Sequence, residues 1–172
     1  MADRNVRTPR EVFLLKQESI SRLDADGQAD LFAEDGVLEV PFAAGGLPRR
    51  FEGRATIRAV TSAALENAQR GTRRLVGHQE ETIYETDDPE VVIAEFVSHT
   101  EDLETGERFQ APYIQLMRVR DGEIVLFRDY CTLDAITRLW GPHGGESYAE
   151  LGNALPGGSP AESLPDGARP AL

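Results

Sequence analysis

The hydrophobic period of the sequence changes near residue 73, and this change restricts the fold more than any other feature. Before it, apolar residues recur at helical spacing; after it, apolar and β-branched residues form short runs separated by turn sequences. The runs are LVGHQEETIYE, EVVIAEFVSHTEDL, APYIQLMRV and EIVLFRDYC, and TDDP, ETGE and RDG divide them. Short turns join antiparallel neighbours, so the second half of the chain is predicted to be a four-stranded antiparallel meander.

Three helices are predicted before the meander. Residues 9–26 carry Val12 and Leu15 at helical spacing, the stretch QADLFAED follows as a short helix, and residues 57–68 form the third. The strand VLEVPF lies between the second and third helices, and residues 133–140 form a closing helical turn. Helices followed by a meander predict an α+β domain, in which the helices cover one face of a curved sheet and enclose a conical pocket.

Composition restricts the organisation of the chain and its partners. One domain is expected over residues 1–143, whereas residues 144–172 hold six glycines, four prolines and one aromatic residue and are expected to form a tail. The net charge of -12 disfavours nucleic acid and membrane surfaces as partners. No apolar run is long enough for a signal peptide or a membrane span, which predicts a cytoplasmic protein. Cys131 is the only cysteine, and no motif calls for a metal, a nucleotide or another cofactor.

Two charged residues interrupt the last apolar strand, at Arg128 and Asp129 in IVLFRDYC. Strand alternation puts Val125, Phe127, Asp129 and Cys131 on one face and Arg128 on the other. If the first face lines the pocket, apolar walls surround the Asp129 carboxylate, and desolvation raises its pKa towards the range useful for proton transfer. Alternatively, Asp129 lies near the strand end and pairs with an arginine in water. The residues alone leave both interpretations open.

Other polar residues could share the pocket with Asp129. His78 could exchange a proton with Asp129 if neighbouring strands bring the two together, although a lone histidine is more often an ordinary hydrogen-bonded residue. Tyr113, Gln115 and Met117 share one face of APYIQLM and would supply an aromatic wall, an amide and a thioether. Core packing is the alternative for this face, and it is the preferred interpretation of Met117.

The chain resembles the NTF2-like superfamily, in particular its SnoaL-like branch. The resemblance depends on the order of the stretches LFAEDGV, FEGRATI, IYETDDP, AEFVSH and VRDGEIVLFRDY. The resemblance covers residues 10–140 and is strongest to the phenazine-biosynthesis A/B proteins and the SnoaL-like polyketide cyclases. It implies a cone-shaped pocket and a homodimer. The superfamily includes isomerases, cyclases, dehydratases, epoxide hydrolases and binding proteins, so the fold leaves the reaction open.

Residue comparisons within the superfamily narrow the chemistry. Ketosteroid-isomerase-like members place a base and a hydrogen-bonding acid where this chain has Val40 and Gln115, which disfavours that route. Limonene-epoxide-hydrolase-like members place an Arg and an Asp where this chain has Phe96 and Ser98, and only their last acid, at Asp129, is kept. SnoaL-like cyclases and phenazine proteins resemble this chain in having an acid at the position of Asp129.

The resulting hypothesis is a cofactor-independent acid/base enzyme that isomerises, cyclises or dehydrates an apolar cyclic or polyketide-like intermediate of small-molecule metabolism. Asp129 would move the proton and His78 would assist. The phenazine proteins resemble this chain in having a histidine near the position of His78. The expected substrate-binding residues are Tyr113, Gln115, Met117, Phe32, Val40, Phe96 and Phe127. The alternative is an accessory protein that binds a hydrophobic small molecule without transforming it. A homodimer is expected through the outer sheet face, with Val91, Ile93, Val97, Leu116 and Leu126.

Overall fold

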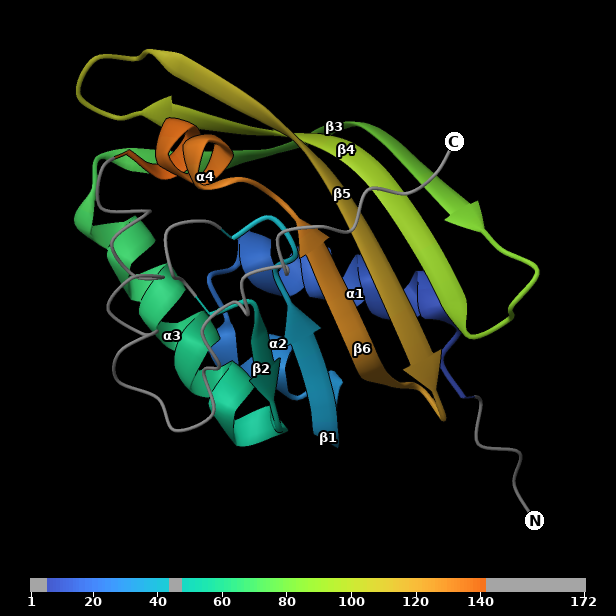
Figure 1. Ribbon diagram of the computed structural model, residues 1–172. Helices are drawn as coiled ribbons and strands as arrows, with labels where there is room; N and C mark the ends of the chain where they lie inside the picture. The colour runs from blue at the N-terminus through green and yellow to red at the C-terminus, as the bar shows by residue number, and fades with distance from the viewer. Residues whose placement is uncertain (1–5, 44–47, 142–172) are drawn as a thin grey trace, which may run out of the picture.

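The computed structural model describes residues 6–43 and 48–141, which form one curved sheet with helices on its concave side (Figure 1). The helices are α1 (Pro9–Ser21), α2 (Ala25–Ala29), α3 (Arg54–Arg70) and α4 (Leu133–Trp140). The strands are β1 (Phe32–Glu39), β2 (Arg50–Glu52), β3 (Arg73–Glu85), β4 (Val91–Asp102), β5 (Arg108–Arg120) and β6 (Glu123–Tyr130). The predicted domain boundary at residue 143 and the tail at 144–172 lie outside the described residues.

The α+β class and the four-stranded meander are confirmed. Strands β3 to β6 pair in chain order, each antiparallel to the next. The sheet is larger than predicted, because β1 pairs in parallel with β6 and β2 adds an edge, giving the order β2-β1-β6-β5-β4-β3. Helix α4 forms at the predicted closing turn and packs against one end of the sheet (Figure 1).

The first two predicted helices were wrong in their bounds. Helix α1 ends at Ser21, five residues before its predicted end, and Leu23 then takes a left-handed conformation with φ of 56°. Helix α2 begins earlier than predicted because the Asp24 side chain caps it, accepting a hydrogen bond of 2.8 Å from the Gly27 amide. The second half of the predicted short helix QADLFAED therefore belongs to strand β1, whose Phe32 is buried opposite Ile124 of β6.

An irregularity in β6 changes one residue of the predicted pocket face. Leu126 pairs with Arg118, but Ile124 pairs with Val119, so Val125 has no partner in the ladder. This is a β-bulge, which exchanges the faces of the residues before it. Ile124, rather than Val125, is therefore buried in the core, while Phe127 after the bulge keeps its predicted inward direction.

The core lies between the helices and the concave face of the sheet. Val12 and Phe13 of α1 and Ile57 of α3 pack there against Met117 and Phe127. The opposite face of the sheet is covered by none of the described helices (Figure 1). On that face, the residues alternating with the buried positions of β4 are partly buried, and Glu95 is exposed. None of the described helices is long and apolar enough to cross a membrane.

Candidate active site

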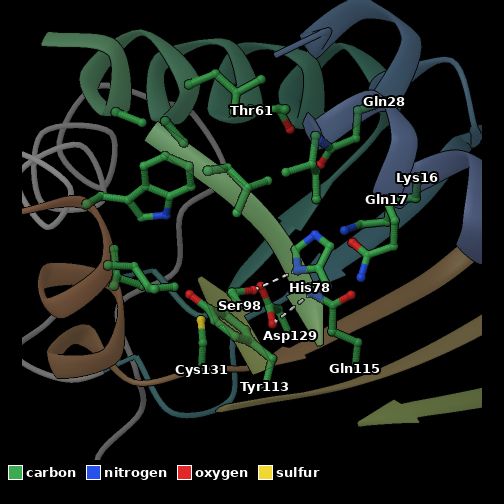
Figure 2. A pocket seen from close by; sticks show the side chains of 18 of the residues that line it. Lys16, Gln17, Gln28, Thr61, His78, Ser98, Tyr113, Gln115, Asp129 and Cys131 are labelled. Carbon is green, nitrogen blue, oxygen red and sulfur yellow. Dashed lines mark hydrogen bonds between the residues drawn. The ribbon is translucent and has the colours of Figure 1, made fainter. Parts of the chain in front are cut away.

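A cavity of about 150 Å³ lies between the helices and the concave face of the sheet. Its apolar walls include Val60 and Leu65 of α3, Phe96 of β4, and Ile136 and Leu139 of α4. Its polar lining comes from separate parts of the chain: Lys16, Gln17, Gln28, Thr61, His78, Ser98, Tyr113, Gln115 and Asp129 (Figure 2). A few polar groups among apolar walls are typical of small-molecule sites.

The two charged residues of FRDY lie on opposite faces of β6. Arg128 points to the outer face, where its Nε donates a hydrogen bond of 2.6 Å to Glu39 on the adjacent strand β1. Asp129 lines the cavity, and Gln115 of β5 donates a hydrogen bond of 3.2 Å to its Oδ1 (Figure 2). Within the described part of the chain, Asp129 forms no ion pair with an arginine, so the solvated-pair interpretation is wrong.

The environment of Asp129 favours its neutral form. Burial raises the pKa of its carboxyl above the usual range, because an apolar cavity solvates a carboxylate poorly. The positive charge of Lys16 and the hydrogen bond from Gln115 lower the pKa and oppose this effect in part. A raised pKa shifts a carboxyl group towards the range in which it can both give and accept a proton.

His78 occupies the cavity without contacting Asp129. Its Nδ1 lies 2.9 Å from Ser98 Oγ, and its ring packs edge-on against Phe96 at 5.0 Å between centroids. Burial, with the charge of Lys16, lowers its pKa to about 4, so the ring is neutral at neutral pH. Strands β4 and β5 separate β3 from β6, so the neighbouring-strand arrangement needed for direct proton exchange with Asp129 does not occur.

Lys16 is a cavity residue that sequence reasoning missed. It is the only lysine of the chain, and it is 2% exposed on α1. Its Nζ lies 4.2 Å from the centre of the Phe127 ring, and burial lowers the pKa of the ammonium to about 8. A signal for this position was present, because Lys16 follows Val12 by one helical turn and therefore lies on the apolar stripe of the helix.

Four buried side-chain atoms in the described residues have no hydrogen-bond partner, and all belong to residues that line this cavity. They are Nε2 and Oε1 of Gln17, Nε2 of His78 and Oε1 of Gln115. An unpaired buried polar atom costs about 1–3 kcal/mol, and native proteins keep few of them. Their convergence in one cavity indicates that a polar ligand or water completes the site.

The structure divides the predicted substrate-binding residues into two groups. Phe96, Tyr113, Gln115 and Phe127 line the cavity, and Tyr113 stacks on Phe96 with 5.6 Å between ring centroids. The remaining three, Phe32, Val40 and Met117, do not line it, contrary to the prediction that they bind substrate.

These three residues are buried behind the cavity wall. Phe32 packs edge-on against Phe127 at 6.3 Å, and Met117 pairs with Phe127 in the ladder and has no exposed surface. Val40 belongs to a separate apolar cluster with Cys131. Each supports a lining residue through packing and does not face the space a ligand would fill.

The described residues contain no group of three or more His, Cys, Asp or Glu side chains that could hold a metal ion. The polar lining of the cavity is instead dominated by amides, hydroxyls, one amine and one carboxyl.

The fold is that of the NTF2-like superfamily, in its SnoaL-like branch. Residues 17–127 match the SnoaL-like domain, and this is more than half of the chain, so the chain belongs to that family. An uncharacterized PhzA/B-like protein of Pseudomonas aeruginosa is 37% identical over 121 residues, which are 70% of this chain and 82% of the relative.

Solved structures share the fold. The crystal structure of a candidate isomerase from Bacillus subtilis has 29% sequence identity and a TM-score of 0.65, over 77% of this chain and 91% of that one. A candidate polyketide cyclase from Pseudomonas putida has 18% identity and a TM-score of 0.58, over 77% of this chain and 98% of that one. The second likeness concerns the fold alone.

Proposed function

We propose that this protein is a cofactor-independent acid/base enzyme of small-molecule metabolism, which isomerises, cyclises or dehydrates an apolar cyclic or polyketide-like intermediate. The observation that carries the proposal is the Asp129 carboxyl, which lines an apolar cavity and is hydrogen-bonded to an amide instead of paired with an arginine. Its raised pKa brings the carboxyl towards the range in which it exchanges protons with carbon or oxygen. The name of the candidate Bacillus subtilis isomerase, at 29% identity, supports this class of reaction.

The other polar groups would position the substrate. The unpaired Oε1 of Gln115 accepts a hydrogen bond from a substrate hydroxyl next to Asp129, and the Tyr113–Phe96 stack supplies a flat apolar wall. The neutral His78 offers its free Nε2 to a substrate oxygen or hydroxyl, so its proposed assistance acts on the substrate and not on Asp129. Planar ring systems fit between these groups.

Deuterium exchange tests the proposal without the natural substrate. Proton transfer at carbon is followed by NMR in D₂O, as exchange next to the carbonyls of a panel of cyclic 1,3-diketones and enones. Asp129→Asn should lower the exchange rate by about 10²- to 10⁴-fold, because it removes the group that carries the proton. Circular dichroism and the melting temperature should show a folded protein.

Asp121→Asn is the matched control, because it removes an exposed carboxylate at the β5–β6 turn and keeps a residue type that tolerates its positive φ of 53°. It should leave exchange unchanged. Exchange that is equal in the wild type and Asp129→Asn would rule out Asp129 as the proton carrier. If ligands then bind and are recovered unchanged, the binding-protein alternative replaces the enzyme.

We also propose that two copies associate through the outer face of the sheet, and that the protein acts in the cytoplasm. Ile114 on this face is 44% exposed, and Val91, Ile93, Val97 and Leu116 are partly exposed beside it. Contiguous apolar patches on sheets usually mark an interface. A two-fold axis would let the same patch cover itself.

A further inference from the structure

Lys16, the only lysine of the chain, differs in its position from the arginines that the structure describes. The arginines in described ion pairs, such as Arg58 and Arg120, lie at least partly on the surface. Lys16 lies in the cavity at 2% exposure, and no hydrogen bond or ion pair engages it within the described residues. An arginine would carry its charge at any pH, whereas a lysine amine can become neutral when desolvated.

The cavity increases the neutral fraction of the amine. Burial lowers the pKa of Lys16 from 10.5 to about 8, so the neutral fraction at pH 7 is roughly 300-fold larger than for an exposed lysine. The titratable groups that share the cavity are His78 on β3, Tyr113 on β5, and Asp129 and Cys131 at the end of β6. Asp129 and Cys131 raise the pKa of Lys16, so the value already includes their opposing effect.

We infer that Lys16 is a nucleophile that forms an imine with an aldehyde or ketone bound in the cavity. A desolvated lysine in an apolar pocket is the usual form of an amine that forms Schiff bases. Its Nζ lies against the Phe127 face, and the ligand oxygen would reach the free amide of Gln17 on the next residue of α1. This inference deepens the proposed function, on which its proton-transfer step rests, by assigning carbonyl compounds as the substrate class.

The chemistry balances with the groups present. The amine lone pair of Lys16 attacks the carbonyl carbon, the C=O π electrons move to oxygen, and a proton passes from nitrogen to oxygen to give a neutral carbinolamine. The Asp129 carboxyl then protonates the hydroxyl, which leaves as water while the nitrogen lone pair forms C=N. Starting from the neutral amine and the protonated carboxyl, the products are an iminium ion and the Asp129 carboxylate, so this step creates one opposite pair of charges.

The imine would also explain why Lys16 and Asp129 line the same cavity. An iminium group withdraws electrons from the neighbouring carbon, so its C–H bond becomes acidic. The Asp129 carboxylate can take that proton. The C–H electron pair then forms a C=C bond and the C=N π electrons move to nitrogen, which gives a neutral enamine. Return of the proton to another position isomerises the ligand, and water then releases it from Lys16.

Reductive trapping tests the covalent step directly. The full chain is incubated at about pH 7 with benzaldehyde or butyraldehyde and sodium cyanoborohydride, and peptide mass spectrometry locates the alkyl group. The benzene ring of benzaldehyde fits a cavity of about 150 Å³. The expected result is saturable labelling of Lys16 in the wild type and its loss in Lys16→Met and Lys16→Arg.

A matched variant provides a comparison within one molecule. Arg10→Lys adds an exposed lysine on the same helix, and Lys16 should react faster than the introduced lysine by up to roughly 300-fold at pH 7. This comparison remains valid even if the loss variants fold poorly. Labelling confined to the N-terminal amine, or an introduced lysine that reacts as fast as Lys16, would overturn the inference.

The two proposals fail separately. Deuterium exchange that depends on Asp129, without trapping at Lys16, keeps the acid/base function and removes the imine. Trapping at Lys16 with exchange that is indifferent to Asp129→Asn keeps the nucleophile and removes the proposed proton carrier.

Discussion

Replacing Lys16 with methionine should stabilise the protein at neutral pH. The folded-state pKa of about 8 lies below the value of 10.5 for a solvated lysine, and this difference corresponds to about 3 kcal/mol. Below pH 8 the folded state carries the full cost of the buried ammonium. Between the two pKa values the unfolded chain binds more protons, so stability rises with pH. Lys16→Met keeps a flexible apolar side chain and removes the titration.

The expected gain is therefore up to about 3 kcal/mol at pH 7, shrinking towards zero as the pH approaches 10.5. Loss of the cation also raises the Asp129 pKa, so the variant can protonate its carboxyl and avoid an unpaired buried charge. Urea unfolding followed by circular dichroism from about pH 7 to about pH 10 measures the difference between variant and wild type.

Two further measurements make this prediction specific to Lys16. Arg10→Met removes an exposed cation from the same helix and should change stability by less than about 0.5 kcal/mol at every pH. Because Lys16 is the only lysine, ¹³C-lysine labelling gives one lysine side-chain resonance. The chemical shift of this resonance should titrate with a midpoint near pH 8. A midpoint near 10.5, or a stability difference independent of pH, would refute the desolvation argument.

Other predictions concern the cavity and the outer face. Cys131 should resist disulfide reagents until the protein unfolds, because the thiol is 2% exposed and burial raises its pKa. Gln17→Leu should stabilise the free protein by about 1 kcal/mol because both amide atoms lack partners, whereas Gln115→Leu should destabilise it by removing a donor to the buried carboxyl. Val97→Asp should dissociate the proposed dimer in sedimentation. Leu103→Asp should not, because Leu103 lies in the β4–β5 hairpin turn and is 65% exposed.

Local patterns predicted the part of the fold that depends on local chemistry. The change of period near residue 73 gave the meander, because turn sequences there force antiparallel neighbours. The parallel pairing of β1 with β6 depends on a partner far away in the sequence, which no local pattern contains. The same applies to Phe32, whose surroundings are compatible with a helix until Ile124 pairs with it. The bulge at Val125 is likewise invisible to strict alternation.

The site shows the same division. Asp129 could be placed because alternation after the bulge is regular and an acid among hydrophobes is conspicuous. The sequence did not predict Lys16 as a cavity residue. A lysine on an apolar helix stripe ordinarily extends its long aliphatic stem until the ammonium reaches water. The structure excludes that arrangement, since the side chain is buried and contacts Phe127. His78 could be recognised as a cavity residue but not placed relative to Asp129, because strand order decides that distance.

The unpaired atoms also restrict the ligand beyond its carbonyl group. Gln17 Nε2 is a donor, whereas Oε1 of Gln17 and of Gln115 are acceptors, and all three lack partners. A ketone or aldehyde oxygen can satisfy only the donor, so a ligand with a carbonyl alone leaves two acceptors unpaired. A hydroxyl on the same ligand satisfies one of them, and the neutral His78 can bind a second polar group. Hydroxylated cyclic ketones should therefore raise the melting temperature more than ketones of equal size without a hydroxyl. The reverse order would show that water already satisfies these amides in the free protein.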